Sequence, residues 1–167
     1  MWQGFCWKEV FPSPKSHVIE SASIYEDAHI NTDIWSKIRP TSSANPHLVL
    51  KAIELSYSCQ QSIDLVLKFR QAFFVEAKDI SNLAILFTIV EDAGLDSMQV
   101  NKAILDGSAM ASLMQNYQQA KALSLKGSPS YIIDNGRQTL YGNVGYRVLL
   151  ANIEEQLNKP ESEASWC

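Results

Sequence analysis

A thiol that catalyses disulfide exchange works with a second thiol close to it. This chain of 167 residues has three cysteines, Cys6, Cys59 and Cys167, and no Cys-x-x-Cys motif. Their odd number and wide spacing do not describe a disulfide framework. Cys6 lies in a predicted strand and Cys59 between two apolar predicted helices, so we expect both to be buried structural thiols. We expect Cys167 to be exposed, which makes it the candidate reactive thiol.

The histidines do not predict a metal centre. His17, His29 and His47 are scattered along the chain, and none has a second histidine or cysteine three or four residues away. Zinc sites usually contain at least one such closely spaced pair. We therefore expect no bound metal, and we expect His47 to be exposed to solvent.

Charge and hydropathy argue against two classes of partner. The formal net charge is −4 at pH 7 and no run of Lys and Arg occurs, whereas proteins that bind nucleic acid usually carry a basic excess. Apolar stretches such as Leu83–Val90 are too short to span a bilayer. The first residues lack the basic start and apolar core of a signal peptide, so we expect a cytoplasmic protein with reduced thiols.

The elements that must position these residues fall into three groups. Residues 3–11 are rich in aromatic and β-branched side chains and stop at Pro12, which predicts a strand. A weak helix or irregular segment over 17–28 and a loop follow. The second group is an all-helical block, because apolar residues recur at helical spacing with breaks between successive stretches. Its predicted helices span about 45–58, 60–76, 79–93, 96–106 and 109–126.

Several helix ends carry specific signals. Asn45 before Pro46 predicts a helix start, because asparagine accepts hydrogen bonds from free N–H groups and proline fits the first turn. Asp96 with Gln99 three residues later predicts a capping box. Gly94 is expected to adopt the left-handed conformation that ends a helix.

Three large side chains in these regions are assigned to packing. Met110 and Met114 lie on the last helix of the block, where flexible thioethers usually fill the core. Trp35 lies in a predicted loop, and an aromatic residue there usually anchors the loop to the core. We expect none of the three to contact a ligand.

The third group, at the C-terminal end, predicts a small sheet and a helix. Residues 131–133 and 139–141 read as short strands, and Asn135-Gly136 between them is a strong hairpin signal. Asn143 is expected to cap a final helix. The apolar stripe of that helix consists of Tyr146, Leu149, Leu150, Ile153 and Leu157. The order of elements predicts an α/β protein with a helical insertion.

Pro129 stands directly before the first of these strands. Proline has no N–H to donate to a sheet, so it belongs at a strand's first residue, on an edge or in a bulge. An ordinary trans proline is the default expectation, since only about 5–6% of X–Pro bonds in folded proteins are cis.

The order of these motifs resembles the DsbA-like thioredoxin-fold family. The matching segments are "AFFVEAKDISN" and "EDAGLD" in the helical block, then "KGSPSYIID", the hairpin "NGRQTLYGN" and the closing helix, over roughly residues 45–158. The resemblance implies a thioredoxin-like sheet with an inserted all-helical domain. Residues 1–44 and 127–167 would form the thioredoxin-like part and residues 45–126 the insertion. Residues 142–146 resemble the turn of a subset related to 2-hydroxychromene-2-carboxylate isomerases.

The resemblance also implies a substrate-binding site at Ser128 and Pro129. Pro129 matches a proline that is cis in the family, and Ser128 matches the residue before it. A cis bond would turn the N–H and C=O of Ser128 towards a groove, where an extended peptide can pair with them as an added strand.

The implied activity is thiol–disulfide exchange on protein or small-molecule thiols. In the family, a strand and a helix that bears Cys-x-x-Cys precede the strand matched by residues 3–11. We therefore expect the catalytic pair to be absent from this chain. Two alternatives remain open: a non-enzymatic peptide-binding module that uses the same groove, and a glutathione-dependent isomerase or transferase relative. We expect no cofactor, with glutathione as the alternative that the last relative would require.

A missing first strand would leave the sheet with an unpaired edge. Such edges attract another chain, and a symmetric dimer is the common result. We therefore expect a homodimer.

Overall fold

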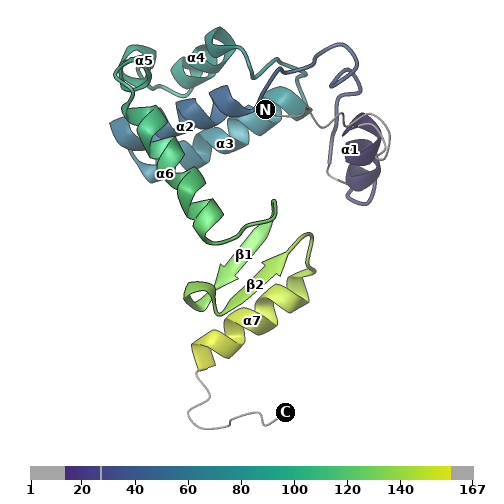
Figure 1. Cartoon of the computed structure of the whole chain (residues 1–167). Coiled ribbons are helices and arrows are strands. Elements are labelled where there is room, and N and C mark those ends of the chain that lie inside the picture. Colours follow the sequence, from purple (N-terminus) through teal and green to yellow (C-terminus); the bar gives the residue numbers. More distant parts are fainter. Residues whose placement is uncertain (1–13, 27, 159–167) are drawn as a thin grey trace, which may run out of the picture. The chain divides into compact units, whose positions relative to one another are not determined.

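The structure is a computed structural model that describes residues 14–26 and 28–158 (Figure 1). The predicted strand over 3–11, with Cys6, and the residue Cys167 lie outside the described residues. The chain divides into two compact units, Met1–Met114 and Gln115–Cys167, whose boundary falls inside a helix. The described helices of the first unit, up to that boundary helix, are α1 (Pro14–Ala22), α2 (Ala44–Ser56), α3 (Cys59–Phe74), α4 (Leu83–Asp92), α5 (Ser97–Leu105) and α6 (Ser108–Ala122).

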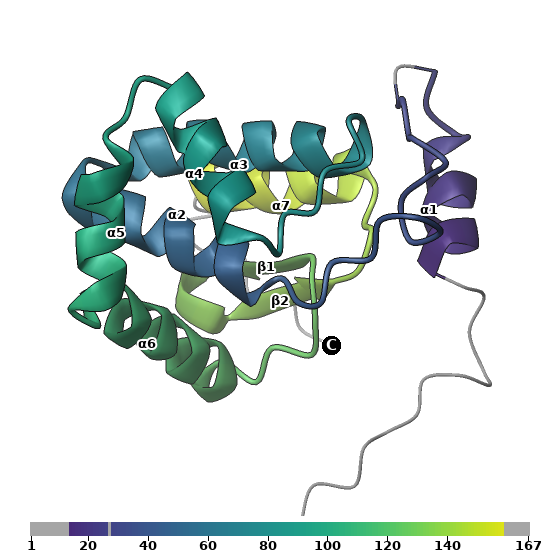
Figure 2. The same ribbon diagram turned by 90° about the horizontal axis from the view of Figure 1, so that it is seen from above.

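The first unit is a helical bundle built around α2 and α3, which lie side by side (Figures 1 and 2). Helix α2 also packs against α5, and α4 closes the same core. Apolar residues recur every three or four positions on α2 and α3, so each helix buries one stripe. The fully buried large side chains of the core are Val49, Ile53, Leu65, Leu86, Val90 and Val100. Each contributes about 1.5–3 kcal/mol by leaving water.

Helix starts follow the predicted capping residues in part. The Asp96 side chain accepts a hydrogen bond from the N–H of Met98 at 2.8 Å, as its predicted role requires. Gln99 does not complete the capping box, because its amide donates to the C=O of Ser56 at 3.0 Å. The N–H of Asp96 instead donates to the Tyr57 hydroxyl at 2.9 Å. Half of the capping box is therefore replaced by contacts with the end of α2.

The predicted cap at Asn45 is wrong. Helix α2 begins at Ala44 with Ser43 as its N-cap, so Asn45 lies inside the first turn. Its side-chain amide donates to the C=O of Ser81 at 2.7 Å, which ties α2 to the segment before α4. Pro46 is buried in the first turn, where its missing N–H costs nothing.

The loop before α2 is held by aromatic contacts. Trp35 packs edge-on against Phe73 and Phe74, with ring centroids 5.2 and 6.3 Å away. The N–H of Asn31 donates to the C=O of Phe74 at 2.7 Å, and Ile34 is fully buried. The expectation that Trp35 anchors its loop to the core is confirmed.

Met110 and Met114 do not fill the core. Their side chains are 45% and 44% exposed, and the residue of α6 that is buried is Ala109. The small alanine lets α6 approach the bundle closely on that side, while the two methionines lie on a side of the helix that the described residues leave open.

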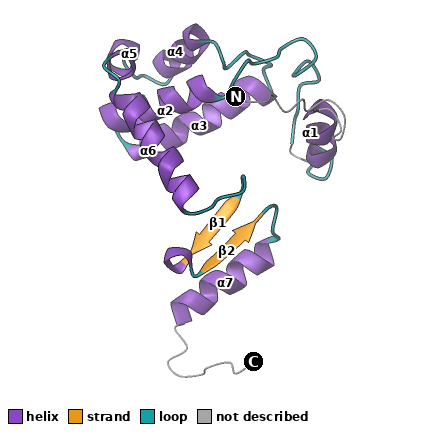
Figure 3. Ribbon diagram, in the orientation of Figure 1, coloured by secondary structure: helices purple, strands orange, loops and turns teal. Residues whose placement is uncertain are grey.

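The second unit is a hairpin with a helix on one face (Figures 1 and 3). Strands β1 (Ser130–Ile133) and β2 (Gln138–Tyr141) pair antiparallel, with Ser130 opposite Tyr141. The tight turn η1 (Asp134–Gly136) joins them, and its three residues all have positive φ. The predicted hairpin turn at Asn135-Gly136 is confirmed.

Helix α7 (Tyr146–Asn158) follows β2 and begins three residues later than the predicted cap at Asn143. Its apolar stripe faces the hairpin but is not fully covered: Ile153 and Leu157 are 50% and 78% exposed. Among the residues that the structure describes, no helix has the length and hydrophobicity needed to cross a bilayer.

The core of the helical unit predicts a sharp contrast between two leucines of α3. Replacing the fully buried Leu65 by alanine should lower the free energy of unfolding by about 2–5 kcal/mol, because it leaves a cavity. The same change at Leu67, which is 63% exposed, should cost about 0.5 kcal/mol or less. Urea unfolding of both variants measures the difference; equal losses would contradict the assignment of the core.

Candidate substrate-binding site

The segment that precedes β1 is held by hydrogen bonds on either side of Ser128. The Ser130 hydroxyl donates to the C=O of Gly127 at 2.6 Å, and the N–H of Gly142 donates to the C=O of Pro129 at 3.0 Å. The Ser128–Pro129 peptide bond is cis. Both residues are exposed. Within residues 14–26 and 28–158, the N–H and C=O of Ser128 have no hydrogen-bond partner.

The geometry accounts for a proline at the mouth of a strand. The residue at position 129 faces Gly142, and a non-proline residue there would donate its N–H to the C=O of Gly142. That C=O instead accepts a hydrogen bond from the N–H of Val144 at 2.9 Å. The sheet therefore loses nothing by having proline at this position.

Gly127 allows Tyr141 to close over the same segment. A Cβ atom at position 127 would lie 2.9 Å from the Tyr141 hydroxyl and 3.2 Å from the ring carbon Cε2. Real Cβ atoms almost never approach so closely, so the Tyr141 ring rests against a position that suits glycine. The Tyr141 ring therefore contacts the segment at Gly127, and Ser128 beside it is exposed.

The hydrogen-bonding direction of each β1 residue follows from the bond between Gly142 and Pro129. In an antiparallel pair, hydrogen-bonded and non-bonded positions alternate. Tyr131 and Ile133 therefore direct their N–H and C=O towards β2, and Ser130 and Ile132 direct theirs to the opposite edge. This edge has no third strand in the described part of the chain. Ser130 and Ile132 therefore present main-chain donors and acceptors at this edge, and the main-chain groups of Ser128, two residues before Ser130, also lack a partner among the described residues.

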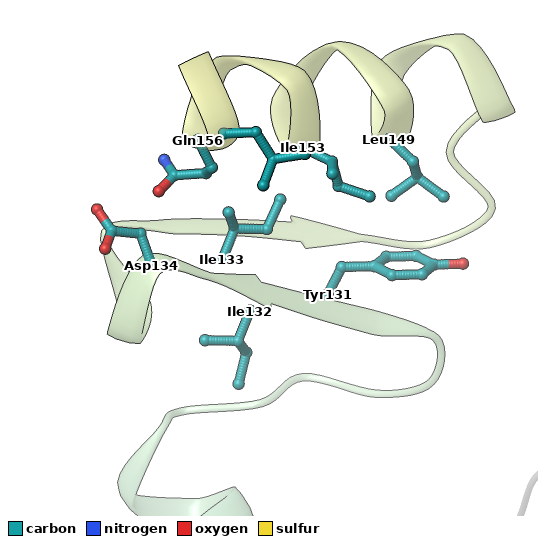
Figure 4. A pocket seen from close by; sticks show the side chains of 8 residues that line it. Tyr131, Ile132, Ile133, Asp134, Leu149, Ile153 and Gln156 are labelled. Atoms are coloured by element: carbon teal, nitrogen blue, oxygen red, sulfur yellow. The ribbon is translucent and has the colours of Figure 1, made fainter. Parts of the chain in front are cut away.

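A groove of about 540 Å³ lies beside this edge, between β1 and α7 (Figure 4). Ile133 points towards α7, whereas Ile132 points to the other face of the hairpin. The residues that line the groove are Tyr131, Ile132, Ile133, Asp134, Leu149, Ile153, Gln156 and Leu157. Asp134 is the single charged residue among them, and its carboxylate pairs with the Arg137 guanidinium at 2.8 Å. The groove therefore suits uncharged, apolar side chains.

The structure corrects one of the predicted thiols. Cys59 is exposed, not buried, and is the first residue of α3. The first buried residue of that helix is Ser62, one turn further on, so the apolar flanks that predicted burial belong to later turns. His47 is exposed, as expected. No cluster of three or more metal-ligating side chains occurs among the described residues.

Hydrogen bonding shifts the pKa of two side chains of the helical unit. The Glu76 carboxylate, 2.7 Å from the Lys78 ammonium, raises the pKa of Lys78. The hydrogen bonds that Asp106 accepts from Ser108 lower the pKa of Asp106. Lys78 and Glu76 form a surface ion pair, and Asp106 accepts its hydrogen bonds at the start of α6. Both shifts therefore have a structural cause and do not indicate a catalytic group.

The sequence profile of the DSBA-like thioredoxin domain matches residues 35–154, more than half of the chain. The chain belongs to this family. A crystal structure of a candidate protein disulfide isomerase from Nitrosomonas europaea has the same fold, with a TM-score of 0.75 at 14% identity. The similarity covers 90% of this chain and 77% of that one. The expected thioredoxin-like α/β fold with a helical insertion is therefore confirmed.

The ClpXP adapter protein SpxH of Halalkalibacterium halodurans is more similar to this chain in sequence than the protein of that crystal structure. It is 25% identical over 137 residues, which make up 78% of this chain and 44% of that protein. The DsbA-like chain therefore spans less than half the length of this relative.

Part of the site could be found from the sequence and part could not. The resemblance predicts Ser128 and Pro129 as candidate site residues, and helical spacing predicts the apolar stripe of α7. The groove itself was not predicted, because periodicity shows that Leu149 and Ile153 face the hairpin but not that their side remains open. One signal for the groove is present in the sequence. The apolar stripe of the final helix is longer than two strands of four residues can cover, so part of it must remain open.

The alternation along β1 predicts a pattern of hydrogen exchange. In dilute solution the amide protons of Tyr131 and Ile133 should exchange slowly, because both are bonded to β2. The amide protons of Ser128, Ser130 and Ile132 should exchange fast. Residue-resolved exchange measured by NMR tests this pattern. Slow exchange at Ser130 and Ile132 with fast exchange at Tyr131 and Ile133 would contradict the register of β1 against β2.

Proposed function

We propose that this DsbA-like chain acts on protein substrates in thiol–disulfide chemistry and binds an extended substrate segment at Ser128 and Pro129. The observation that carries the proposal is the pair of exposed main-chain groups of Ser128, which no described residue satisfies. An extended polypeptide can pair with such groups as an added strand, with side chains at alternate positions supplying specificity.

The surroundings of Ser128 favour a polypeptide over a small polar ligand. The N–H and C=O groups of Ser130 and Ile132 face the edge of β1 that no described strand covers, and the groove beside them is lined mostly by apolar side chains. A peptide that pairs with this row would direct every second side chain towards the groove. The names of the two relatives, an adapter protein and a candidate disulfide isomerase, also favour protein partners.

The candidate reacting thiols within this sequence are Cys6, Cys59 and Cys167. Cys59 is exposed on the first turn of α3, and Cys167 is the reactive thiol that we proposed from the sequence. Neither belongs to a Cys-x-x-Cys motif, so the chemistry must be tested separately from substrate binding.

Binding is tested by titrating the isotope-labelled chain with reduced insulin B chain, an extended polypeptide that contains cysteines. We expect the amide resonance of Ser128 to shift strongly. Ser128→Ala keeps both main-chain groups and should bind like the wild type. Ser128→Pro removes the donor and should weaken binding up to about tenfold, the loss of one hydrogen bond. An unchanged Ser128 resonance at saturation would refute this site.

Chemistry is tested by following the reduction of insulin by dithiothreitol in the presence of the chain. We expect turnover above the uncatalysed rate, and we expect Cys167→Ser to abolish it while Cys59→Ser does not. A rate equal to the background for the wild type would exclude enzyme activity for this chain and leave substrate binding alone. Titration with millimolar glutathione in a calorimeter is the control for a small-molecule thiol.

A further inference from the structure

The Tyr141 side chain lies against the residue that directly precedes Ser128. A Cβ atom at position 127 would lie 2.9 Å from the Tyr141 hydroxyl oxygen and 3.4 Å from Cζ, the ring carbon that carries it. The hydroxyl end of the ring therefore contacts Gly127. Consecutive Cα atoms are about 3.8 Å apart, so the phenol lies one residue away from the position where we propose that substrate binds.

The register of the hairpin fixes the face on which this ring lies. Tyr141 is directly opposite Ser130, and residues directly opposite each other in an antiparallel pair direct their side chains to the same face. Ser130 and Ile132 share that face by alternation along β1, and Ile132 points to the face away from α7 (Figure 4). Tyr141 therefore lies on the face of the hairpin that α7 does not cover.

The Tyr141 hydroxyl is available for a hydrogen bond to a bound molecule. Tyr141 is 57% exposed, and within residues 14–26 and 28–158 its hydroxyl has no hydrogen-bond partner. The Tyr57 hydroxyl, by contrast, accepts a hydrogen bond from the N–H of Asp96 at 2.9 Å and stabilises the fold. Tyrosine combines an apolar ring with a polar tip, and it is enriched in binding surfaces for this reason.

We infer that Tyr141 is a specificity-determining residue of the substrate site, an inference that rests on the proposed function. Its hydroxyl donates a hydrogen bond to an acceptor of the segment bound at Ser128, and the exposed part of its ring packs against an apolar or aromatic side chain of that segment. An extended substrate directs alternate side chains to opposite faces. One set meets the apolar groove beside α7, and the other set meets Tyr141. The preferred substrate is therefore an extended segment with apolar or aromatic side chains on both faces.

Replacing Tyr141 by phenylalanine removes the hydroxyl and keeps the ring. In the titration with reduced insulin B chain, Tyr141→Phe should bind up to about tenfold more weakly than the wild type, the loss of one hydrogen bond. Tyr146→Phe is the matched control, because Tyr146 is 74% exposed and begins α7, on the other face of the hairpin. This control should bind like the wild type. Urea unfolding checks that both variants keep the wild-type stability.

A second measurement follows the hydroxyl directly. In a chain isotope-labelled at the tyrosine Cζ atom, the Tyr141 resonance should shift when insulin B chain binds, and the Tyr146 resonance should not. Wild-type affinity of Tyr141→Phe, or a Tyr141 resonance that stays in place at saturation, would overturn the inference. A Ser128 amide resonance that still shifts in that case would leave the proposed function intact. If the Ser128 resonance also stays in place, the proposed function and the inference both fail.

Discussion

Each residue of a strand directs its N–H and C=O to one side, and in β1 only alternate residues find a partner. Pro129, Tyr131 and Ile133 face β2, while Ser130 and Ile132 face an edge that no described strand covers. The register that produces this division is fixed by the hydrogen bond from Gly142 to Pro129. A shift of one residue would exchange the two sets and move every side chain to the other face of the sheet. The candidate site and the groove beside it both depend on this register.

The position of Pro129 follows from the same constraint. Proline is tolerated where an N–H is not needed, and here the acceptor that it would have used is already bonded to Val144. The Tyr141 ring rests against Gly127, and the Ser130 hydroxyl donates a hydrogen bond to the C=O of Gly127. Ser128 thus lies between two residues whose C=O groups accept hydrogen bonds, and its own main-chain groups have no partner among the described residues. Main-chain groups without such a partner can pair with an extended chain as an added strand.

Much of the fold could be predicted from the sequence, because local signals and periodicity agreed with each other. The helical block, the hairpin turn at Asn135-Gly136 and the amphipathic α7 all have strong local patterns. The errors arose where a tertiary contact outweighed a local rule. Asn45 bonds to Ser81 instead of capping its helix, and Gln99 bonds to the end of α2. Cys59 and Met110 were expected to be buried but are exposed. That expectation was wrong because sequence spacing does not show which side of a helix the neighbouring elements leave uncovered.

The most direct test of this account is the measurement of scalar couplings across the hydrogen bonds of the hairpin by NMR. The register predicts couplings from the Gly142 amide nitrogen to the Pro129 carbonyl carbon and from the Tyr131 amide nitrogen to the Leu140 carbonyl carbon. No coupling should join Ser130 or Ile132 to β2. A coupling from the Ser130 or Ile132 amide nitrogen to a β2 carbonyl would contradict the register, and with it the open edge on which the proposed binding site depends.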